Sequence, residues 1–552
     1  MLAVSSASAD ALYSSFQWPI PKRYNMGTDV VGKWAESEAD RLALIHVHAD
    51  AKADHYTFGQ MHEFSNQLAH VLRDQGLEPG DRLGVLLPQA PETAFAHVAA
   101  FKAGCISIPL FTLFGHDALL FRLKDSQARA VVTNLEGAAR LSELRDQLPD
   151  LKVVLTIDGH APDTCDLWAA MRPFSTDFTP VDTSSDDPAV IIYTSGTTGN
   201  PKGALHAHRV LLGHLPGVEM SHGLLPHPDD RFWTPADWAW IGGLFDVLMP
   251  AWHHGIPVVA HRFQKFDPEA AFQLMQDYHV RNTFLPPTAL KMLRKVDSAR
   301  TRWRYDLRSV ASGGESLGAE LLDWGRKVLG VTINEFYGQT ECNMLVSSSD
   351  PLVPVRPGAI GRPVPGHDVR IINDDGQPVQ PGEHGLIAVR APDPVMFLRY
   401  WNNPSGTHDK FNGDWLLTGD MGYQDDEGYI YFLGRNDDVI TSSGYRIGPG
   451  EIEDCLLQHP LVRMAAVIGG PDPQRTEVVV AVVVLSDPEQ ASETLKKELQ
   501  EHVKTRLAAH EYPREVYFVE ELPMTTTGKI VRRELRAQLA VWRNRSQAQS
   551  AK

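Results

Sequence analysis

Two spacings of apolar residues alternate along the first part of the chain. Short continuous apolar runs at residues 82–88 and 130–133 are typical of buried strands. Between them, residues 91–104 and 117–127 repeat their apolar positions every three or four residues, as helices do. The alternation continues as strand, helix and strand at residues 256–260, 268–278 and 282–285. This order predicts an α/β fold with a mainly parallel, doubly wound sheet.

The pattern changes after residue 357. From there to residue 434, glycine and proline separate short strands such as 369–372 and 386–390, which predicts a small β-barrel-like subdomain. Beyond it, the pattern predicts a helix followed by two strands, at residues 451–458, 463–468 and 478–485. We therefore expect an N-terminal domain (1–434), a hinge (435–438) and a mobile α+β C-terminal domain (439–552), with a frayed tail from residue 544.

Composition narrows the class of protein. The 552 residues, 43% of them hydrophobic, are enough for several domains with large cores. A formal net charge of −17 opposes a nucleic-acid partner, because such partners require clustered Lys and Arg. The 4 cysteines form no CxxC pair, so neither a zinc site nor a disulfide framework is expected. No basic leader and no run near the about 18 apolar residues of a membrane span is visible, so we expect a cytoplasmic protein.

A loop rich in glycine and hydroxyl residues follows the apolar strand that ends near residue 192. Residues 193–203 read YTSGTTGNPKG. A triphosphate needs backbone N–H groups that glycine lets approach closely, together with hydroxyl donors and a cation. The loop is not a Walker A motif, because no Gly-Lys pair is present. The candidate phosphate-binding residues are Thr194, Ser195, Gly196, Thr197, Thr198, Gly199 and Lys202.

This loop resembles the phosphate loop of the adenylate-forming superfamily, which includes acyl-CoA synthetases, free-standing adenylation domains and firefly-type luciferases. Six further motifs occur in the order of that family, at residues 312–316, 335–341, 418–420, 434–438, 443–446 and 523–529. Beyond residue 434 the chain is most similar to medium-chain acyl-CoA synthetases. The resemblance implies an ATP-dependent carboxylic acid:CoA ligase that uses ATP, Mg²⁺ and coenzyme A and passes through an acyl-AMP intermediate.

The implied reaction brings a carboxylate to the α-phosphate of ATP, so positioned cations are needed to join the two anions. By resemblance, Lys529 bridges the two groups, Thr340 contacts the α-phosphate and Glu341 binds Mg²⁺, a hard ion that takes carboxylate and phosphate oxygens. Asp420 is expected to accept from both ribose hydroxyls. The remaining AMP-binding residues implied are Gly314, Glu315, Ser316, Glu335, Phe336, Tyr337, Gly338, Gln339 and Arg435.

The resemblance also implies a moving C-terminal domain. Asp437 is similar to the hinge residue about which that domain swings between the two half-reactions. The residues expected to contact coenzyme A are Ser443, Gly444, Tyr445, Arg446, Arg475, Lys504, Tyr512 and Arg514. Because the turn around Lys529 resembles those that protein acetyltransferases modify, and acetylation removes the charge, an acetyltransferase is an expected partner.

The acyl pocket is expected around Trp240, Gly313 and Gly338. Acetate-specific relatives carry tryptophan where this chain has Gly338, so a deeper pocket and medium-chain acids are favoured. Aryl or branched short-chain acids, transfer to a carrier protein, and a non-catalytic nucleotide-binding scaffold stay open as alternatives, as does the choice of monomer or homodimer. Two residues replace glycines usual in the family, Asn343 and Thr476. The histidines form no ligand pattern, so no metal besides magnesium is expected: His206, His208, His253 and His254.

Overall fold

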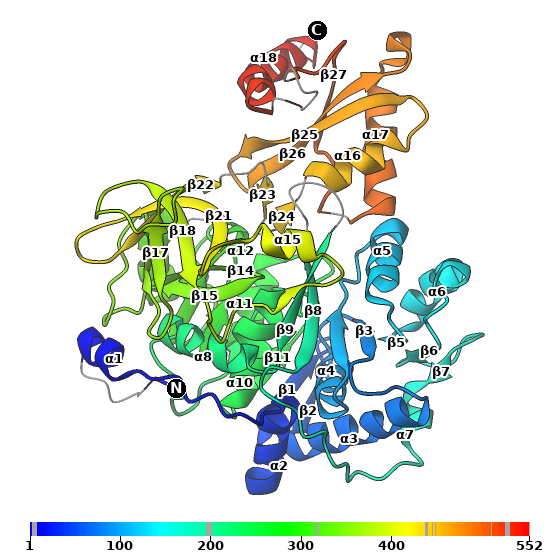
Figure 1. Cartoon of the computed structure of the whole chain (residues 1–552), viewed down its shortest axis with the longest axis vertical. Coiled ribbons are helices and arrows are strands. Elements are labelled where there is room, and N and C mark those ends of the chain that lie inside the picture. The colour runs from blue at the N-terminus through cyan, green and yellow to red at the C-terminus, as the bar shows by residue number, and fades with distance from the viewer. Residues whose placement is uncertain are drawn as a thin grey trace. The chain divides into compact units, whose positions relative to one another are not determined.

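The computed structural model describes residues 1–2, 8–194, 201–314, 317, 319–435, 440–443, 445–447, 449–508, 510–524, 530 and 532–550. It divides into two compact units. The larger unit holds residues 1–112, 123–192 and 203–434, and the smaller holds residues 113–122, 193–202 and 435–552. Figure 1 colours the chain from its N-terminus to its C-terminus. The predicted hinge at Asp437 lies outside the described residues, so its motion stays a prediction.

An eight-stranded sheet carries the start of the candidate phosphate loop, in the order β19-β9-β8-β4-β3-β5-β6-β7. Its central strands are parallel, whereas β19 pairs antiparallel to β9. Its strands are β3 (Arg82–Leu86), β4 (Ile106–Pro109), β5 (Ala130–Thr133), β6 (Val153–Thr156), β7 (Cys165–Asp166), β8 (Pro188–Thr194), β9 (Lys202–Ala207) and β19 (Arg399–Tyr400).

A second, 14-stranded sheet carries most of the other candidate residues. One part is parallel from β1 through β14, apart from the antiparallel edge strand β2. The strands of this part are β1 (Leu42–Val47), β2 (Ala53–Thr57), β10 (Phe232–Trp233), β11 (Val258–Ala260), β12 (Asn282–Phe284), β13 (Ser309–Ser312) and β14 (Ile333–Gln339). This arrangement confirms the predicted α/β class with parallel sheets.

The sheet becomes antiparallel where β14 turns back into β15, and the short strands predicted after residue 357 continue it. They are β15 (Cys342–Ser347), β16 (Ala359–Pro363), β17 (Val369–Ile372), β18 (Gly385–Arg390), β20 (Phe411–Asn412), β21 (Trp415–Gln424) and β22 (Ile430–Arg435). Burial in β21 alternates along the strand, as expected for a strand with one face on the core.

Helices connect and cover these strands. Helix α3 begins with a capping box, in which Thr57 Oγ1 accepts from Gln60 N and Gln60 Oε1 accepts from Thr57 N. Helix α4 is buried along its whole length. The helices of residues 1–434 are α1 (Ala9–Ser15), α2 (Lys33–Glu38), α3 (Phe58–Asp74), α4 (Pro91–Lys102), α5 (His116–Ser126), α6 (Leu135–Leu144), α7 (Leu167–Met171), α8 (Val210–Ser221), α9 (Ile241–Gly243), α10 (Met249–His253), α11 (Pro268–Asp277), α12 (Pro287–Leu293), α13 (Ala299–Arg302), α14 (Ala319–Trp324) and α15 (Pro404–His408).

The smaller unit contains a five-stranded sheet in the order β24-β23-β26-β25, with β27 on the other side of β26. Its valine-rich strand β26 pairs with β25 from Val462↔Leu485 to Asp472↔Thr476, and alternate valines join Leu535 and Leu539 in one apolar cluster. Its elements are β23 (Ile440–Ser442), β24 (Tyr445–Ile447), α16 (Pro449–Leu457), β25 (Val462–Asp472), β26 (Thr476–Leu485), α17 (Glu493–Arg506), β27 (Glu515–Phe518) and α18 (Arg532–Ser550). Figure 1 shows them in orange to red.

The prediction of a frayed tail from residue 544 was wrong for residues 544–550. The backbone is helical through Ser550, because residues 544–550 continue α18, whose Leu535 and Leu539 are anchored in the apolar cluster of the smaller unit. A polar sequence without Gly or Pro then propagates a helix that packing has already nucleated. Among all the helices described, none is long and apolar enough to cross a membrane.

Candidate active site

The hairpin β14–β15 carries the largest group of predicted nucleotide-binding residues. Gln339 pairs with Cys342, so Thr340 and Glu341 form the two-residue turn between the strands. Thr340 is half-buried and Glu341 is buried. The hairpin thus places the residues expected to contact the α-phosphate and Mg²⁺ at its tip, directly after the residues expected around adenine.

Side chains of this hairpin reach the strand that holds the predicted ribose-binding aspartate. Tyr337 Oη donates to Asp420 Oδ2 over 2.6 Å, and the Asp420 side chain is fully buried. Gln339 Nε2 donates to the carbonyl of Thr418 over 2.9 Å. Thr418 Oγ1 in turn accepts from Asp420 N over 3.1 Å. The structure therefore brings together two motifs that are 79 residues apart, as the hydrogen bond from Gln339 shows.

Glu335 holds the segment that follows β13. Its Oε1 accepts from Leu317 N over 3.0 Å, and its Oε2 has no hydrogen-bond partner among the described residues. Burial raises the pKa of Glu335 to about 8, because its desolvation outweighs the hydrogen bond from Leu317 N. Glu335 therefore supports the segment around Gly314, which has φ of +95°. The predicted residues Glu315 and Ser316 lie outside the described residues.

Gly313 lies where the segment meets the hairpin. A Cβ at Gly313 would lie 2.7 Å from Cε2 of Phe336, so only glycine lets the backbone approach this ring. Phe336 is buried and packs against Phe284, with ring centroids 5.4 Å apart. The predicted adenine side and the predicted acyl side of the site thus share the aromatic ring of Phe336.

Glu341 was predicted as the metal ligand. Its Oε1 accepts a hydrogen bond from the hydroxyl of Tyr400 in β19. Buried His206 lies near it, and burial lowers the pKa of His206 to about 4 although the charge of Glu341 opposes the shift. A buried carboxylate next to the turn residue Thr340 fits a magnesium ion that takes its other ligands from phosphate and water. Among the described residues no group of three or more His, Cys, Asp or Glu side chains could hold a metal ion by itself.

The ends of the candidate phosphate loop lie close together. Thr194 ends β8 and Lys202 begins β9, and Thr194 Oγ1 donates to the carbonyl of Lys202 over 3.4 Å. Ser195, Gly196, Thr197, Thr198 and Gly199 lie outside the described residues. The loop thus starts and ends on adjacent strands of the eight-stranded sheet.

The predicted acyl-pocket residues come from separate elements. Trp240 precedes α9 and is half-buried, with its ring centroid 5.4 Å from that of Phe111. A Cβ at Gly338 would overlap Asn343 Oδ1 and lie 2.6 Å from Asn343 Cα. The space beside Gly338 is therefore taken by Asn343, one of the two residues noted as a departure from the family. Gly338 alone does not deepen the pocket in this chain.

The predicted coenzyme A residues of the smaller unit are partly brought together. Ser443 N donates to the carbonyl of Arg475 over 3.1 Å. The guanidinium of Arg514 stacks over Tyr512 at 4.2 Å, and its pKa is lowered by burial and by nearby Arg475. Tyr445 stacks on His510, with centroids 3.9 Å apart. Lys504 is an exception, since it forms a surface ion pair with Glu501 at 3.2 Å.

Several of the remaining predicted residues are not described in full. Arg435 and Arg446 are placed by their backbone alone, at the end of β22 and within β24. Gly444, the predicted hinge residue Asp437 and the predicted catalytic residue Lys529 lie outside the described residues. Their roles stay predictions.

The other departure from the family has a structural consequence. Thr476 has φ of +69°, in the left-handed region where glycine is usual and a β-branched residue is strained. It begins β26 and pairs with both Ser442 and Asp472. Thr476 thus keeps the left-handed backbone conformation that the glycine usual at this position would adopt without strain.

Three of the four noted histidines have side-chain contacts with other described residues. His208 Nδ1 accepts from Met26 N over 3.2 Å, and His253 Nδ1 lies 2.6 Å from Asp29 Oδ2. His254 Nε2 lies 3.0 Å from Glu219 Oε1, within a buried cluster. These contacts are consistent with their interpretation as structural residues.

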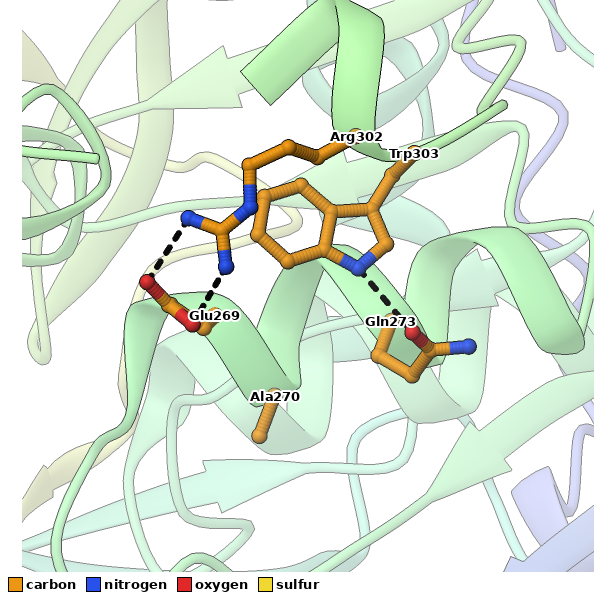
Figure 2. Close-up of a pocket in the computed structure, with 5 residues that line it drawn as sticks. All are labelled: Glu269, Ala270, Gln273, Arg302 and Trp303. Atoms are coloured by element: carbon orange, nitrogen blue, oxygen red, sulfur yellow. Dashed lines mark hydrogen bonds and ion pairs between the residues drawn. The ribbon is translucent and has the colours of Figure 1, made fainter. Parts of the chain in front are cut away.

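A surface pocket elsewhere in the larger unit contains none of the predicted residues. Figure 2 shows that Arg302 of α13 forms a paired contact with Glu269 of α11, at 2.8 and 2.6 Å. The adjacent Trp303 Nε1 donates to Gln273 Oε1 over 3.0 Å. Because the polar groups drawn are already paired with each other, this pocket offers little to a charged ligand.

Sequence reasoning missed several residues of the site. Tyr400 and Thr418 contact predicted residues from distant strands, and only Thr418 stood in a recognised motif. Asp246 contacts both Asn343 and His214, and the sequence signal for Asp246 and His214 was a polar residue within an apolar helical stretch. The departure at Asn343 was a second signal for this region.

Comparison with known proteins agrees with this geometry. Residues 31–401 match the family model of the AMP-binding enzymes, and residues 451–529 match that of the AMP-binding enzyme C-terminal domain. The mitochondrial acyl-coenzyme A synthetase ACSM4 of Homo sapiens is 36% identical over 546 residues, which cover 96% of this chain and 92% of that protein. The acetyl-coenzyme A synthetase of Bacillus subtilis is 35% identical over 527 residues, with 93% and 90% covered.

Solved structures of similar fold include acyl-CoA synthetases. The crystal structure of a Brucella canis acyl-CoA synthetase matches with a TM-score of 0.72 and 33% identity, covering 97% of this chain and 99% of that one. The first family model covers the hairpin, and the curated relatives and the solved structure match more than nine-tenths of the chain. The chain belongs to the AMP-binding, adenylate-forming enzyme family.

Proposed function

We propose that the protein is an ATP-dependent carboxylic acid:CoA ligase of the AMP-forming type. The observation that supports this most is the β14–β15 hairpin, whose side chains contact Asp420, Tyr400 and Asp246 from three other segments. Such an arrangement would join the proposed ribose contact, metal contact and acyl pocket around one turn. The acyl-coenzyme A synthetases similar to the chain over most of its length support coenzyme A as the acceptor.

The reaction has two steps. A carboxylate oxygen of the acid attacks the α-phosphorus of ATP, the bond to the β-phosphate oxygen breaks, and pyrophosphate leaves. The thiol sulfur of coenzyme A then attacks the acyl carbonyl, loses its proton, and AMP leaves. The charge of Lys529 would stabilise the first transition state, where negative charge gathers between carboxylate and phosphate. The phosphate loop from Thr194 to Lys202 would hold the departing pyrophosphate.

Magnesium would be held by Glu341 and by the phosphates. When bound, the ion supplies charge neutralisation at the phosphate oxygens. Tyr400 donates to Glu341 Oε1 and so restricts the carboxylate to one orientation. Thr340, half-buried in the same turn, would donate its hydroxyl to the α-phosphate.

Coenzyme A would bind on the smaller unit. Burial and the nearby charge of Arg475 lower the pKa of the Arg514 guanidinium, and two neighbouring cations suit a phosphate. Ser443, Gly444 and Tyr445 would line the pantetheine, with Arg446 and Tyr512 beside it. A domain rotation about Asp437 would exchange Lys529 for this surface between the two steps.

The acid is proposed to be of medium chain length, with aryl and branched short-chain acids as alternatives for the pocket around Trp240 and Gly313. Transfer to a carrier-protein phosphopantetheine is the nearest alternative reaction. An assay that offers coenzyme A and a carrier protein side by side would separate the two acceptors. We also propose a cytoplasmic protein, monomeric or homodimeric, whose Lys529 a protein acetyltransferase modifies; intact-mass analysis after acetyl-donor incubation tests the last point.

Lys529→Ala tests the proposed mechanism. Loss of one transition-state donor lowers rates by about 10² to 10³, so acid-dependent ATP–pyrophosphate exchange should fall by at least that factor. Thioester formation from supplied acyl-AMP should stay near the wild-type rate. Equal losses in both assays would contradict the division of labour, and no exchange with any acid in the wild type would contradict the function.

A further inference from the structure

A cluster of three buried polar side chains lies between the elements that form the predicted acyl pocket. Asp246 comes from the π-helix Leu244–Leu248 after α9, Asn343 from β15 and His214 from α8, and their exposed fractions are 3%, 4% and 0%. Asn343 Nδ2 donates to Asp246 Oδ1 over 2.8 Å, and His214 Nε2 lies 3.9 Å from the same oxygen. We call these three residues the polar floor.

The polar floor is continuous with the residues predicted to surround the acyl group. On one side, the space beside Gly338 is occupied by Asn343. On the other side, a Cβ at Gly242 would lie 2.9 Å from the ring of Phe284 and 3.6 Å from Asp246 Oδ2. Gly242 is the second residue after Trp240, so the Trp240 segment and the Gly338 strand meet at Asp246 and Asn343.

Aromatic contacts link Gly313 to the same group of residues. Phe284 packs against Phe336, and Phe336 fills the space beside Gly313. All three predicted pocket residues are therefore linked by direct neighbours to Asp246 or Asn343. An acyl chain that enters between Trp240, Gly313 and Gly338 would end at the polar floor.

The polar floor keeps unused hydrogen-bonding capacity. His214 Nδ1 lies 2.7 Å from the carbonyl of Val210, which fixes the proton on that nitrogen. Within the described part of the chain, His214 Nε2 has no hydrogen-bond partner. Burial lowers the pKa of His214 to about 3, so the ring is neutral and Nε2 is an acceptor.

Asp246 supplies the complementary donor. Burial raises the pKa of its carboxyl well above the ordinary value, which favours the protonated form that can donate a hydrogen bond. Oδ1 already accepts from Asn343, which leaves the proton on Oδ2. Oδ2 makes no hydrogen bond to any described residue and faces Gly242. A donor and an acceptor thus stand near each other beside the residues predicted to form the acyl pocket.

We propose that Asp246, Asn343 and His214 form the floor of the acyl pocket and select carboxylic acids that carry a hydroxyl group along their chain. A hydroxyl oxygen would accept from Asp246 Oδ2 and its hydrogen would be donated to His214 Nε2. An all-hydrocarbon acid of the same length would leave both groups unpaired. This inference deepens the proposed function and rests on it.

The chemistry disfavours two other substituents. An ammonium group brings a charge that a protonated Asp246 does not neutralise, and a second carboxylate meets no cation in the polar floor. A site built to pair with a substrate hydroxyl rejects the analogue that lacks it far more strongly than an apolar pocket rejects an added hydroxyl. Selection therefore works mainly against unsubstituted acids.

The test compares length-matched acids in the full-length enzyme with ATP and coenzyme A. kcat/KM is measured for hexanoate and for each of the hydroxyhexanoates, and the ratio of hydroxy acid to hexanoate is the readout. We expect a ratio of at least about 10 for one positional isomer in the wild type. Asp246→Leu should reduce that ratio at least ten-fold and raise kcat/KM for hexanoate.

A matched pair of histidine variants guards against loss of folding. His214→Phe removes the acceptor, whereas His222→Phe removes a similarly buried ring that lies against Phe232 and pairs with Ser309 Oγ at 2.8 Å. His214→Phe should lower the ratio and His222→Phe should leave it at the wild-type value. Because the readout is a ratio, it does not depend on the fraction of active enzyme.

Three results would overturn the proposal while leaving the ligase function intact. They are a wild-type ratio of one or less for every isomer, a ratio that Asp246→Leu and His214→Phe leave unchanged, and a preference for aminohexanoates over hydroxyhexanoates. Absence of thioester from every acid, hexanoate included, would instead overturn the proposed function.

Discussion

Replacing Tyr337 by phenylalanine removes one hydroxyl from the centre of the candidate site. That hydroxyl donates to Asp420 Oδ2 over 2.6 Å, and both side chains are buried. The ring of Tyr337 stays, so the packing against its neighbours is kept. The substitution removes the hydrogen bond to the carboxylate that is expected to hold the ribose.

The size of the effect follows from burial. A hydrogen bond to a charged group contributes about 1.5 to 3 kcal/mol, and its acceptor here is fully buried and finds no water in exchange. At about 1.4 kcal/mol for each factor of ten, this predicts about 10-fold to 150-fold weaker binding of ATP. The ribose contact is the same in the ground state and the transition state, so KM for ATP should rise while kcat stays near wild type.

The assay pairs the variant with a changed substrate. KM is measured for ATP and for 2′,3′-dideoxy-ATP, which lacks both hydroxyls that Asp420 is expected to bind. If Tyr337 acts by orienting Asp420, its loss should matter with ATP and hardly with the dideoxy analogue. Tyr429→Phe is the matched control, because Tyr429 is also buried and donates to a distant carbonyl, that of Pro354, over 3.0 Å.

An equal rise of KM for both nucleotides would refute the reasoning, since Tyr337 would then act without the ribose. A fall in thermal stability with no change in either KM would refute it too. Tyr429→Phe should leave both KM values unchanged.

Three further predictions follow from single residues. Glu335→Gln removes a carboxyl whose pKa burial raises from 4.5 to about 8, so the folded protein binds that proton more tightly than the unfolded chain does. As the pH rises between those values, the wild type should lose up to about 1.4 kcal/mol of unfolding free energy per pH unit, and the variant should not. An equal change of unfolding free energy in both proteins between pH 5 and pH 8, measured with urea, would contradict this. Thr476→Gly relieves a left-handed conformation that costs about 1 to 2 kcal/mol. The greater entropy of glycine in the unfolded chain offsets about 0.5 to 1 kcal/mol of this gain. Hydrogen exchange of β26 should therefore slow, and faster exchange would speak against strain. Asp437→Pro should preserve ATP–pyrophosphate exchange and block thioester formation; equal retention of both would argue against a hinge at this residue.

The pattern of apolar positions was sufficient for most of the fold. Residues 130–133 and 369–372 were predicted as strands and are β5 and β17. Such runs are decided locally, because their neighbours bury them on both faces or on one. The end of the chain was different. The tail after residue 544 is polar, and only the packing of Leu539 earlier in the helix explains why α18 continues.

In the candidate site, too, the motifs could be recognised in the sequence, whereas the contacts between distant residues could not. The motif of Asp420 and that of Tyr337 could each be recognised in the sequence, and the hydrogen bond between them could be expected only from the family. The contact of Asn343 with Asp246 could not be predicted, since it joins residues 97 apart and neither stands in a recognised motif. Side-chain contacts of this kind depend on the packing of whole sheets, which apolar periodicity does not determine.

The β14–β15 hairpin explains why one short segment governs several functions. Every second residue from 337 to 343 makes a side-chain hydrogen bond, and the four bonds reach three segments of the larger unit. Tyr337 and Gln339 bond to Asp420 and Thr418 of β21, Glu341 bonds to Tyr400 and Asn343 bonds to Asp246.

These partners belong in turn to the ribose, metal and acyl sides of the proposed site. A displacement of the hairpin would therefore disturb nucleotide binding and acid selection together, whereas the substitutions proposed above, Tyr337→Phe and Asp246→Leu, each break one link. If the hairpin is the common support, Tyr337→Phe should leave the hydroxyhexanoate ratio unchanged and Asp246→Leu should leave KM for ATP unchanged. If each substitution changes only its own measurement, the KM for ATP or the hydroxyhexanoate ratio, the hairpin is rigid enough to support nucleotide binding and acid selection independently.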